Sequence, residues 1–424
     1  MERKRYERLD ETMFHTVLPN GLPIYVDEKP EYGKQFAFFA THYGGMNMRY
    51  QVEGGPWQET PAGVAHFLEH KMFDTEDGNA LQILAANGVD PNAFTSSSLT
   101  GYYFEGTDGF EENLRTLLSF VSVPYFTPES VAKEQGIIGQ EIRMGEDNPD
   151  SEVFYNLLKG LYHHNPIRVH IAGTVESIAA ITADTLYACH RAFYNPGNMV
   201  LCVAGNVNAD RIAEIAAQVL PASPAPAVRT DFGGEEGPQV HQALVECRMA
   251  VSAPQFQIGF KGEPPAQGED LRQRLLGSLA GDVLFGPSSP LYARLYEQGL
   301  INGTFGGGYE AEPQCAFLAV GGESKQPEQV RDAVLAEAVR LAREGIDSDL
   351  WERQRKAAYG SMVRQLNSLE NICIEAAQAH FAGEDFLMFP ALFQSITKAD
   401  AEEFIRRWCV PERTTLSIVW PKEV

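Results

Sequence analysis

The chain is poor in basic residues and has no long apolar run. Its 424 residues include 34 Lys and Arg against 57 Asp and Glu, which gives a formal net charge of −23. Nucleic acids and anionic membranes attract clustered cations, so we expect neither as a partner. No apolar stretch approaches the roughly 18 residues that would span a bilayer. Positions 1–8 carry charges of both signs with no apolar stretch behind them, unlike a signal peptide.

The chain also lacks paired cysteines. Its six cysteines are scattered and form no C-x-x-C pair. This usage fits a reduced cytoplasmic protein with buried thiols better than a disulfide framework or a thiolate zinc site. Hydrophobic residues make up 44% and charged residues 21%, a globular composition whose length predicts two or three domains.

A stretch rich in Pro, Gly and acidic residues at 221–238 predicts a solvated linker between two domains, 1–220 and 239–424. The two domains look related. In the first, a helical segment ends at Phe193, and Pro196 and a strand follow; in the second, Trp408, Pro411 and a strand follow in the same order. Both pairs of positions differ by 215, which indicates a duplication. Two unrelated helix–strand units are the alternative.

Within each domain, strands and helices mix without regular alternation. The pattern predicts strands at 21–27 and 36–43, a strand pair at 92–95 and 99–104, and helices near 61–73, 78–87, 110–122 and 128–145. We therefore predict an α+β fold of two homologous halves, each an antiparallel-type sheet with helices packed on it.

One short predicted helix carries the residues that could bind a metal ion or take part in catalysis. Thr60 followed by Pro61 predicts its start. His66 and His70 lie one turn apart on the same face, so both imidazoles can reach one metal ion. Glu69 lies beside that face, close enough to take a proton from water without being a ligand. This H-x-x-E-H order predicts a zinc site, and two histidines beside a surface carboxylate are the alternative.

Zinc needs a third protein ligand and an open position. A second helix, predicted to start at Thr127 and Pro128, offers Glu134 and Glu141, two turns apart on one face. Glu141 lies in an apolar run, where an unpaired carboxylate would be costly. Glu134 suits a position behind a ligand or an assisting role near the water. Spacing alone leaves the choice of ligand open.

With these motifs the chain resembles the insulinase/pitrilysin zinc metallopeptidases, family M16, and most closely their bacterial half-length members. Besides the histidine motif and the paired glutamates, the matching segments are L-P-N-G-L at 18–22, N-A-F-T-S at 92–96 and F-Y-N-P-G-N-M at 193–199. The resemblance covers essentially the whole chain. Segments 140–144 and 171–177 are similar to a cytoplasmic subgroup associated with modification of elongation factor P.

The resemblance implies that the two halves enclose a cavity. It also implies that His66, His70 and Glu141 hold Zn²⁺, with Glu69 and Glu134 as catalytic residues. The peptide substrate would add as a strand to a sheet edge, formed by Asn92, Ala93, Phe94 and Thr95. The expected function is a zinc endopeptidase that hydrolyses unfolded peptides or small proteins. A non-catalytic scaffold or processing-complex subunit that keeps the fold is the alternative.

One segment departs from the family pattern. Active members carry an Arg and a Tyr seven residues apart that bind substrate opposite the zinc, but here Tyr296 occupies the Arg position. The second half also lacks an H-x-x-E-H motif. We therefore expect a dimer, in particular a heterodimer with a paralogue that supplies the Arg–Tyr clamp. Closure by Arg294 or Tyr309 in a lone chain or a homodimer is the alternative.

Overall fold

The computed structural model describes residues 1–223 and 225–422, and the chain divides into two compact units. Unit 1 contains residues 1–142, 169–231 and 363–387; unit 2 contains residues 143–168 and 232–362, and resumes at Met388. Each unit therefore takes one segment from the other half of the sequence. The boundaries predicted from composition did not include this exchange.

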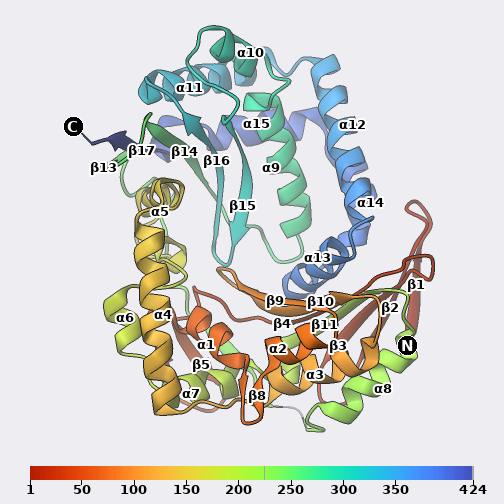
Figure 1. Ribbon diagram of the computed structural model, residues 1–424. Helices are drawn as coiled ribbons and strands as arrows, with labels where there is room; N and C mark the ends of the chain where they lie inside the picture. The colour runs from red at the N-terminus through yellow and green to blue at the C-terminus, as the bar shows by residue number, and fades with distance from the viewer. Residues whose placement is uncertain (224, 423–424) are drawn as a thin grey trace. The chain divides into compact units, whose positions relative to one another are not determined.

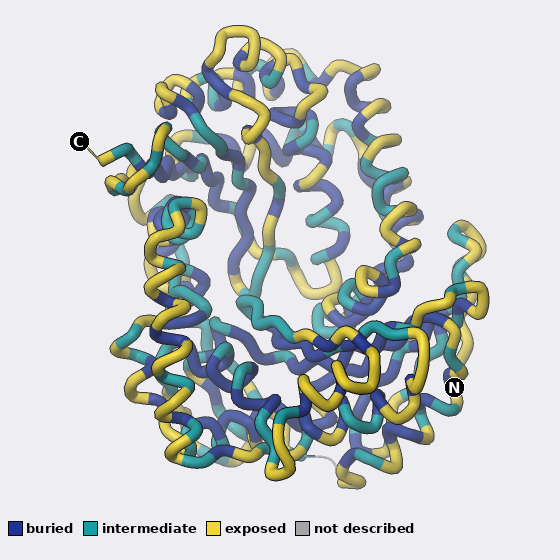
Figure 2. Tube along the Cα trace, viewed as in Figure 1, coloured by how far each residue is buried: buried dark blue, intermediate teal, exposed yellow. Residues whose placement is uncertain are grey.

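Unit 1 is built on a seven-stranded sheet in the order β1-β2-β3-β11-β4-β10-β9 (Figure 1). All neighbouring strands are antiparallel except β11 and β3, so the predicted antiparallel type holds with one parallel pair. The strands are β1 Glu2–Tyr6, β2 Glu11–Val17, β3 Pro23–Glu28, β4 Gln35–Thr41, β9 Asp90–Thr95, β10 Thr100–Gly106 and β11 Met199–Gly205. β11 is buried along its whole length, and the central strands are dark in Figure 2.

Helices cover both faces of this sheet. Alternate residues such as Phe39 and Leu201 point into a core that is closed by helices of the first half of the sequence. The opposite face packs against α13 Leu369–Ala382, which comes from the second half. The other helices of unit 1 are α1 Val64–Met72, α2 Ala80–Ala86, α3 Phe110–Ser122, α4 Pro128–Glu146, α6 Val175–Ala179, α7 Ala183–Phe193 and α8 Ala209–Val219. Of these, α4 continues from unit 1 into unit 2.

Unit 2 repeats the plan with a five-stranded sheet in the order β13-β17-β14-β16-β15. Its strands are β13 Leu244–Met249, β14 Gln255–Gly262, β15 Gly306–Glu312, β16 Cys315–Glu323 and β17 Thr414–Pro421. One face packs against α5 Pro149–Leu161, where Gly160 allows a close approach, because a Cβ there would collide with the methyl group of Thr415. The remaining helices are α9 Asp270–Phe285, α10 Pro290–Glu297, α11 Pro327–Glu344, α12 Ser348–Gln365, α14 Phe389–Ser395 and α15 Lys398–Trp408.

The predicted duplication is visible in the topology. The helix–strand pair α7–β11 recurs 215 residues later as α15–β17, with Thr182 and Thr397 as the N-caps of the two helices. β11 runs parallel to β3 and antiparallel to β4, and β17 runs parallel to β13 and antiparallel to β14. The two halves therefore share one strand order around equivalent central strands.

The predicted linker at 221–238 is more ordered than a solvated connector. Its strand β12, Val228–Thr230, pairs with β5 Arg49–Val52, which in turn pairs with β6 Trp57–Glu59. Backbone pairing thus fixes part of a segment that its composition predicts to be a solvated linker. Pro224 lies outside the described residues. The remaining short strands are β7 Asp74–Thr75 and β8 Gly78–Asn79.

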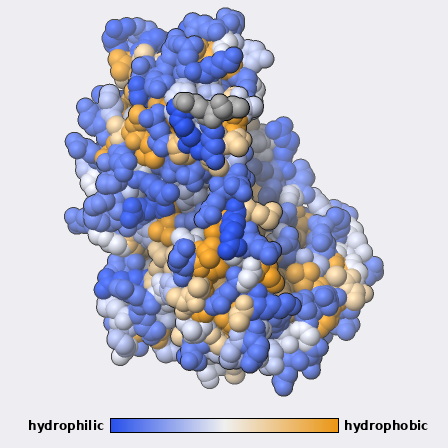
Figure 3. Space-filling model, turned by 60° about the vertical axis from the view of Figure 1, so that its left-hand side comes forward, coloured by the Kyte–Doolittle hydropathy of each residue, from blue (hydrophilic) through white to orange (hydrophobic). Residues whose placement is uncertain are grey.

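The surface agrees with the composition. Hydrophilic residues cover most of the face drawn in Figure 3. Among the described residues, no helix combines the length and apolarity that crossing a membrane requires.

Candidate metal centre

Helix α1, which carries the histidine motif, begins three residues later than predicted. Its N-cap is Gly63, with φ 93°, and a Cβ at this position would lie 2.5 Å from the carbonyl oxygen of Ala172. Only glycine suits both the left-handed backbone and the close approach. Thr60, the predicted cap, instead donates a hydrogen bond from its hydroxyl to the Met48 carbonyl at 3.2 Å. The predicted start at Thr60 and Pro61 was therefore wrong, because the packing of Gly63 against Ala172 determines where the helix begins.

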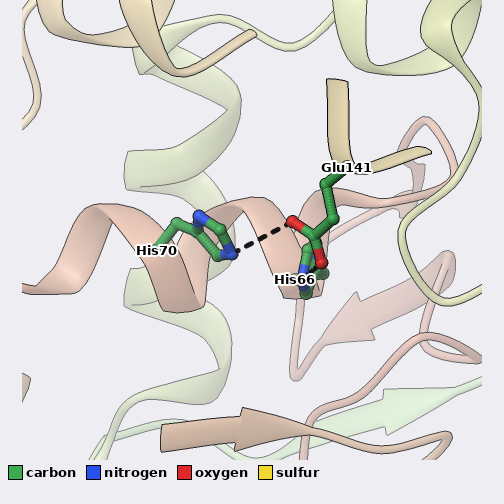
Figure 4. A group of neighbouring side chains, drawn as sticks. All are labelled: His66, His70 and Glu141. Carbon is green, nitrogen blue, oxygen red and sulfur yellow. Dashed lines mark ion pairs between the residues drawn. The ribbon is translucent and has the colours of Figure 1, made fainter. Parts of the chain in front are cut away.

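The two histidines of α1 turn toward the same carboxylate (Figure 4). His66 Nε2 lies 3.4 Å from Glu141 Oε1, and His70 Nε2 lies 3.6 Å from Glu141 Oε2. One ligand atom from each of the three residues falls within 4.8 Å of the other two. Residues on α1 and α4, 71 to 75 positions apart in the sequence, are thus brought to one point.

Glu141 reaches this point from α4, whose predicted cap at Thr127 is present: the Thr127 hydroxyl accepts from the Ser130 N–H at 3.1 Å. The argument from an apolar run was wrong, however, because the Glu141 side chain is 49% exposed. Its pKa is lowered, chiefly by the hydrogen bond with His66; burial acts in the opposite direction, and charge interactions with His66, His70 and His170 lower the pKa further.

Glu134 contacts the ring nitrogen of His70 that does not face Glu141. Its Oε1 is 3.1 Å from His70 Nδ1, and its side chain is only 14% exposed. Burial would lower the pKa of His70, but the hydrogen bond with Glu134 and the nearby carboxylates of Glu69 and Glu141 raise it. A proton on Nδ1 that is donated to Glu134 leaves Nε2 with a lone pair directed at Glu141. The two glutamates therefore contact different nitrogens of one imidazole.

The donor set fits zinc. Ligand nitrogens and oxygens held about 2.0–2.1 Å from a tetrahedral zinc ion lie about 3.4 Å apart, close to the two nitrogen–oxygen distances found here. Two imidazoles and a carboxylate are the nitrogen and oxygen ligands that catalytic zinc sites use. His66 Nδ1 is buried without a hydrogen-bond partner among the described residues, so no hydrogen bond at this nitrogen orients the ring.

Glu69 lies on α1 between the histidines, and its residue surface is 9% exposed. The Thr95 hydroxyl donates to Glu69 Oε2 at 2.9 Å. Phe67 and Leu68, its neighbours on α1, are fully buried. The sequence offered no signal for the contact between Thr95 and Glu69, since the two residues come from separate elements.

The predicted substrate strand is β9, at the edge of the unit 1 sheet. It pairs with β10 on one side, and its other side ends the sheet order. Asn92 is exposed, Ala93 is partly buried, and Phe94 stacks on Phe38 with ring centroids 5.8 Å apart. Thr95 faces the other way, toward α1. An edge strand of this kind offers unpaired backbone groups on its outer side.

His170 was missed by the sequence reasoning. It contributes to lowering the Glu141 pKa, and its Nδ1 accepts from the Ala172 N–H at 3.2 Å. No spacing motif links position 170 to the glutamate pair, so only the folded chain reveals this charge interaction with Glu141. The exposed pair His163 and His164 lies in unit 2, where the two rings hydrogen-bond to each other at 3.0 Å.

Comparisons with known proteins agree with the fold and show the family. Residues 47–175 match the family described as insulinase (peptidase family M16), and residues 180–358 match the peptidase M16 inactive domain. The chain is 36% identical over 423 residues to "Uncharacterized zinc protease YmfH" of Bacillus subtilis (strain 168), and the match covers 98% of each chain.

Two solved structures extend this likeness. An M16-like peptidase from Alicyclobacillus acidocaldarius superposes with a TM-score of 0.93 at 32% identity, covering 97% of this chain and 99% of that one. A protease from Helicobacter pylori shares the fold, with a TM-score of 0.81 at 17% identity and 96% and 99% coverage. Both family models, together with a relative alike over almost its whole length, show that the chain belongs to the insulinase peptidase family, M16.

Proposed function

We propose that the chain is a zinc-dependent endopeptidase that hydrolyses peptide bonds of unfolded peptides or small proteins. The observation that carries the proposal is the convergence of His66 Nε2 and His70 Nε2 on the carboxylate of Glu141, with Glu69 on the same helix. Relatives named zinc proteases support it.

Each residue has a distinct task in this proposal. Zinc, when bound by His66, His70 and Glu141, supplies a Lewis acid that polarises the scissile carbonyl and lowers the pKa of water. Glu69 accepts the proton of the attacking water and passes it to the leaving amine. Glu134 orients the His70 ring through Nδ1. An extended peptide pairs with the outer edge of β9, which makes recognition tolerant of sequence.

A partner subunit belongs to the proposal. Tyr296, at the position of the family's clamp arginine, is 56% exposed and stacks on Tyr292 with ring centroids 6.0 Å apart. The neighbouring cation Arg294 pairs with Glu337 at 3.3 Å, and Tyr309 is buried. Arg294 already has an ion-pair partner and Tyr309 is not exposed, so these side chains do not replace the family's Arg–Tyr clamp. This supports a heterodimer with a paralogue that carries the clamp. Six unpaired cysteines support a reducing compartment, the cytoplasm.

Metal analysis and peptide hydrolysis on three variants test the assignment. Glu141→Gln removes an anionic ligand, and we expect zinc affinity to fall at least about 100-fold. Glu69→Gln leaves the donor set intact, so zinc should stay at one equivalent per chain while hydrolysis falls about 10²- to 10⁴-fold. Glu146→Gln, on the exposed end of the same helix as Glu141, is the matched control and should change neither.

The measurements use an unfolded peptide library, with and without chelator, on the chain alone and with its paralogue. Loss of zinc from Glu69→Gln but not from Glu141→Gln would show that the two roles are reversed. A wild-type chain that binds no zinc and cleaves no peptide under either condition would instead identify a non-catalytic scaffold.

A further inference from the structure

Thr95 is the last residue of β9, and its side chain faces helix α1. Strand alternation places it there, because its neighbour Phe94 lies on the opposite face of the sheet against Phe38. The Thr95 hydroxyl oxygen lies 2.9 Å from Glu69 Oε2. All of these residues belong to unit 1. The contact therefore ties the edge strand of the sheet to the carboxylate beside the metal-binding histidines.

The direction of this hydrogen bond follows from its surroundings. The Thr95 hydroxyl donates and the carboxylate oxygen of Glu69 accepts. Behind it, the fully buried Thr100 donates its hydroxyl proton to the Tyr43 carbonyl at 2.8 Å, and its oxygen lies 3.4 Å from that of Thr95. The Thr95 proton is therefore directed at Glu69 Oε2, 2.9 Å away, rather than at the more distant Thr100 oxygen.

The hydrogen bond leaves the two oxygens of Glu69 unequal. Oε2 is held by Thr95, whereas Oε1 has no hydrogen-bond partner among the described residues. We propose that Thr95 is a positioning residue, which holds the Glu69 carboxylate so that Oε1 is presented for proton transfer. This inference rests on the proposed function and adds to it a part for the Thr95 side chain, the orientation of the base, beside the pairing of the β9 backbone with substrate.

The same residue then connects substrate to base. The backbone of β9 forms the sheet edge to which a peptide would add, and the Thr95 side chain leaves that strand toward α1. A peptide paired with β9 would thus be connected to Glu69 through the single residue Thr95. Proton transfer depends steeply on such placement.

Steady-state kinetics on Thr95→Val and Thr95→Ser separate positioning from substrate binding. Valine keeps the shape of threonine without the donor, and we expect kcat to fall about 10- to 100-fold while KM stays within about twofold. Serine keeps the donor and should restore kcat. Thr116→Val, on α3 far along the chain from the motif, is the control for the same chemical change. A Thr95→Val enzyme with wild-type kcat, or with a raised KM and unchanged kcat, would overturn the inference.

Two further readouts do not need turnover. In a Glu69→Gln background, Thr95→Val should leave the affinity for an unfolded peptide unchanged, and a weaker affinity would assign Thr95 to substrate binding instead. With Co²⁺ in place of zinc, the visible absorption spectrum should be the same in wild type, Thr95→Val and Thr95→Ser, because Thr95 contacts Glu69 and none of the three metal ligands; a changed spectrum in Thr95→Val would show that Thr95 supports the metal ligands and would contradict the inference. Failure of the wild-type chain to bind Co²⁺ or Zn²⁺ overturns the proposed function and the role of Thr95 with it.

Discussion

Glu236 holds three separate stretches of unit 2 together. Its Oε1 accepts hydrogen bonds from the backbone N–H groups of His163, His164 and Asn165 at 2.9, 2.5 and 2.8 Å. Its Oε2 accepts from the ammonium group of Lys261, on β14, at 2.8 Å. The carboxylate thus ties the segment after α5, which comes from the first half of the sequence, to the sheet of the second half.

The pKa of Glu236 gives the size of the effect. Burial alone would raise it, but Lys261 and the three backbone donors lower it from its ordinary 4.5 to about 2. At about 1.4 kcal/mol per pH unit, this difference corresponds to about 3 kcal/mol of stability. The side chain is 12% exposed and partly screened by solvent, so we expect Glu236→Gln to destabilise unit 2 by about 2 kcal/mol at pH 7.

The sign of the pH dependence follows from the lowered pKa. The folded state binds the Glu236 proton less readily than the unfolded chain does, so the stabilisation is complete above pH 4.5 and disappears as the pH falls toward 2. The difference in unfolding free energy between wild type and Glu236→Gln should therefore shrink steadily between pH 4.5 and pH 2.

Tryptophan fluorescence during urea denaturation can report on unit 2 alone. Three of the four tryptophans, Trp351, Trp408 and Trp420, lie in unit 2, so Trp57→Phe removes the signal from unit 1. Glu235→Gln, at the exposed neighbouring position, is the control for loss of one charge. If Glu236→Gln and Glu235→Gln unfold at the same urea concentration from pH 7 to pH 3, the Glu236 carboxylate does not anchor residues 163–165 to the sheet and the reasoning is wrong.

Two further predictions concern the metal centre and the assembly. Gly63→Ala combines a left-handed backbone with a Cβ 2.5 Å from the Ala172 carbonyl, so it should cost about 2–4 kcal/mol in the unfolding of unit 1 and weaken zinc binding. Gly88→Ala, also at positive φ but with no atom within 4 Å of the Cβ, should cost only about 1 kcal/mol and leave zinc unchanged; equal losses would remove the steric argument. Co-expression with a paralogue that has the Arg–Tyr clamp should give a heterodimer by size-exclusion chromatography and raise peptide turnover. Full turnover by the lone chain, unchanged by the paralogue, would contradict the heterodimer without affecting the zinc ligands.

Some features of the site and the fold are local, and the sequence predicted them. His66 and His70 share a helix face because four residues make about one turn, whatever the rest of the chain does. The matched helix–strand pairs α7–β11 and α15–β17 keep their offset of 215 because each is a short helix, turn and strand specified by its own residues. Periodicity and capping act over a few residues, so they can be read without a structure.

Contacts between distant elements could not be read in this way. The spacing of Glu134 and Glu141 left their roles open, and the fold directs one carboxylate to His70 Nδ1 and the other to both Nε2 atoms. The exposure of Glu141 contradicts the burial argument that first favoured it, because an apolar sequence neighbourhood does not determine which face of α4 meets solvent. The start of α1 at Gly63 depends in the same way on the carbonyl of Ala172, more than a hundred residues away.

The sequence by itself therefore determined the α+β halves, their duplication and the one-turn spacing of the histidine motif, because these depend on hydrogen bonding and side-chain pattern within short segments. Only the tertiary structure decided that α5 and α13 pack on the sheets of the opposite halves, and that Thr95 donates to Glu69. Each of these depends on which surfaces come into close packing after the chain has folded. That choice is made by shape and hydrogen-bond partners across many tens of residues, beyond the reach of any local pattern.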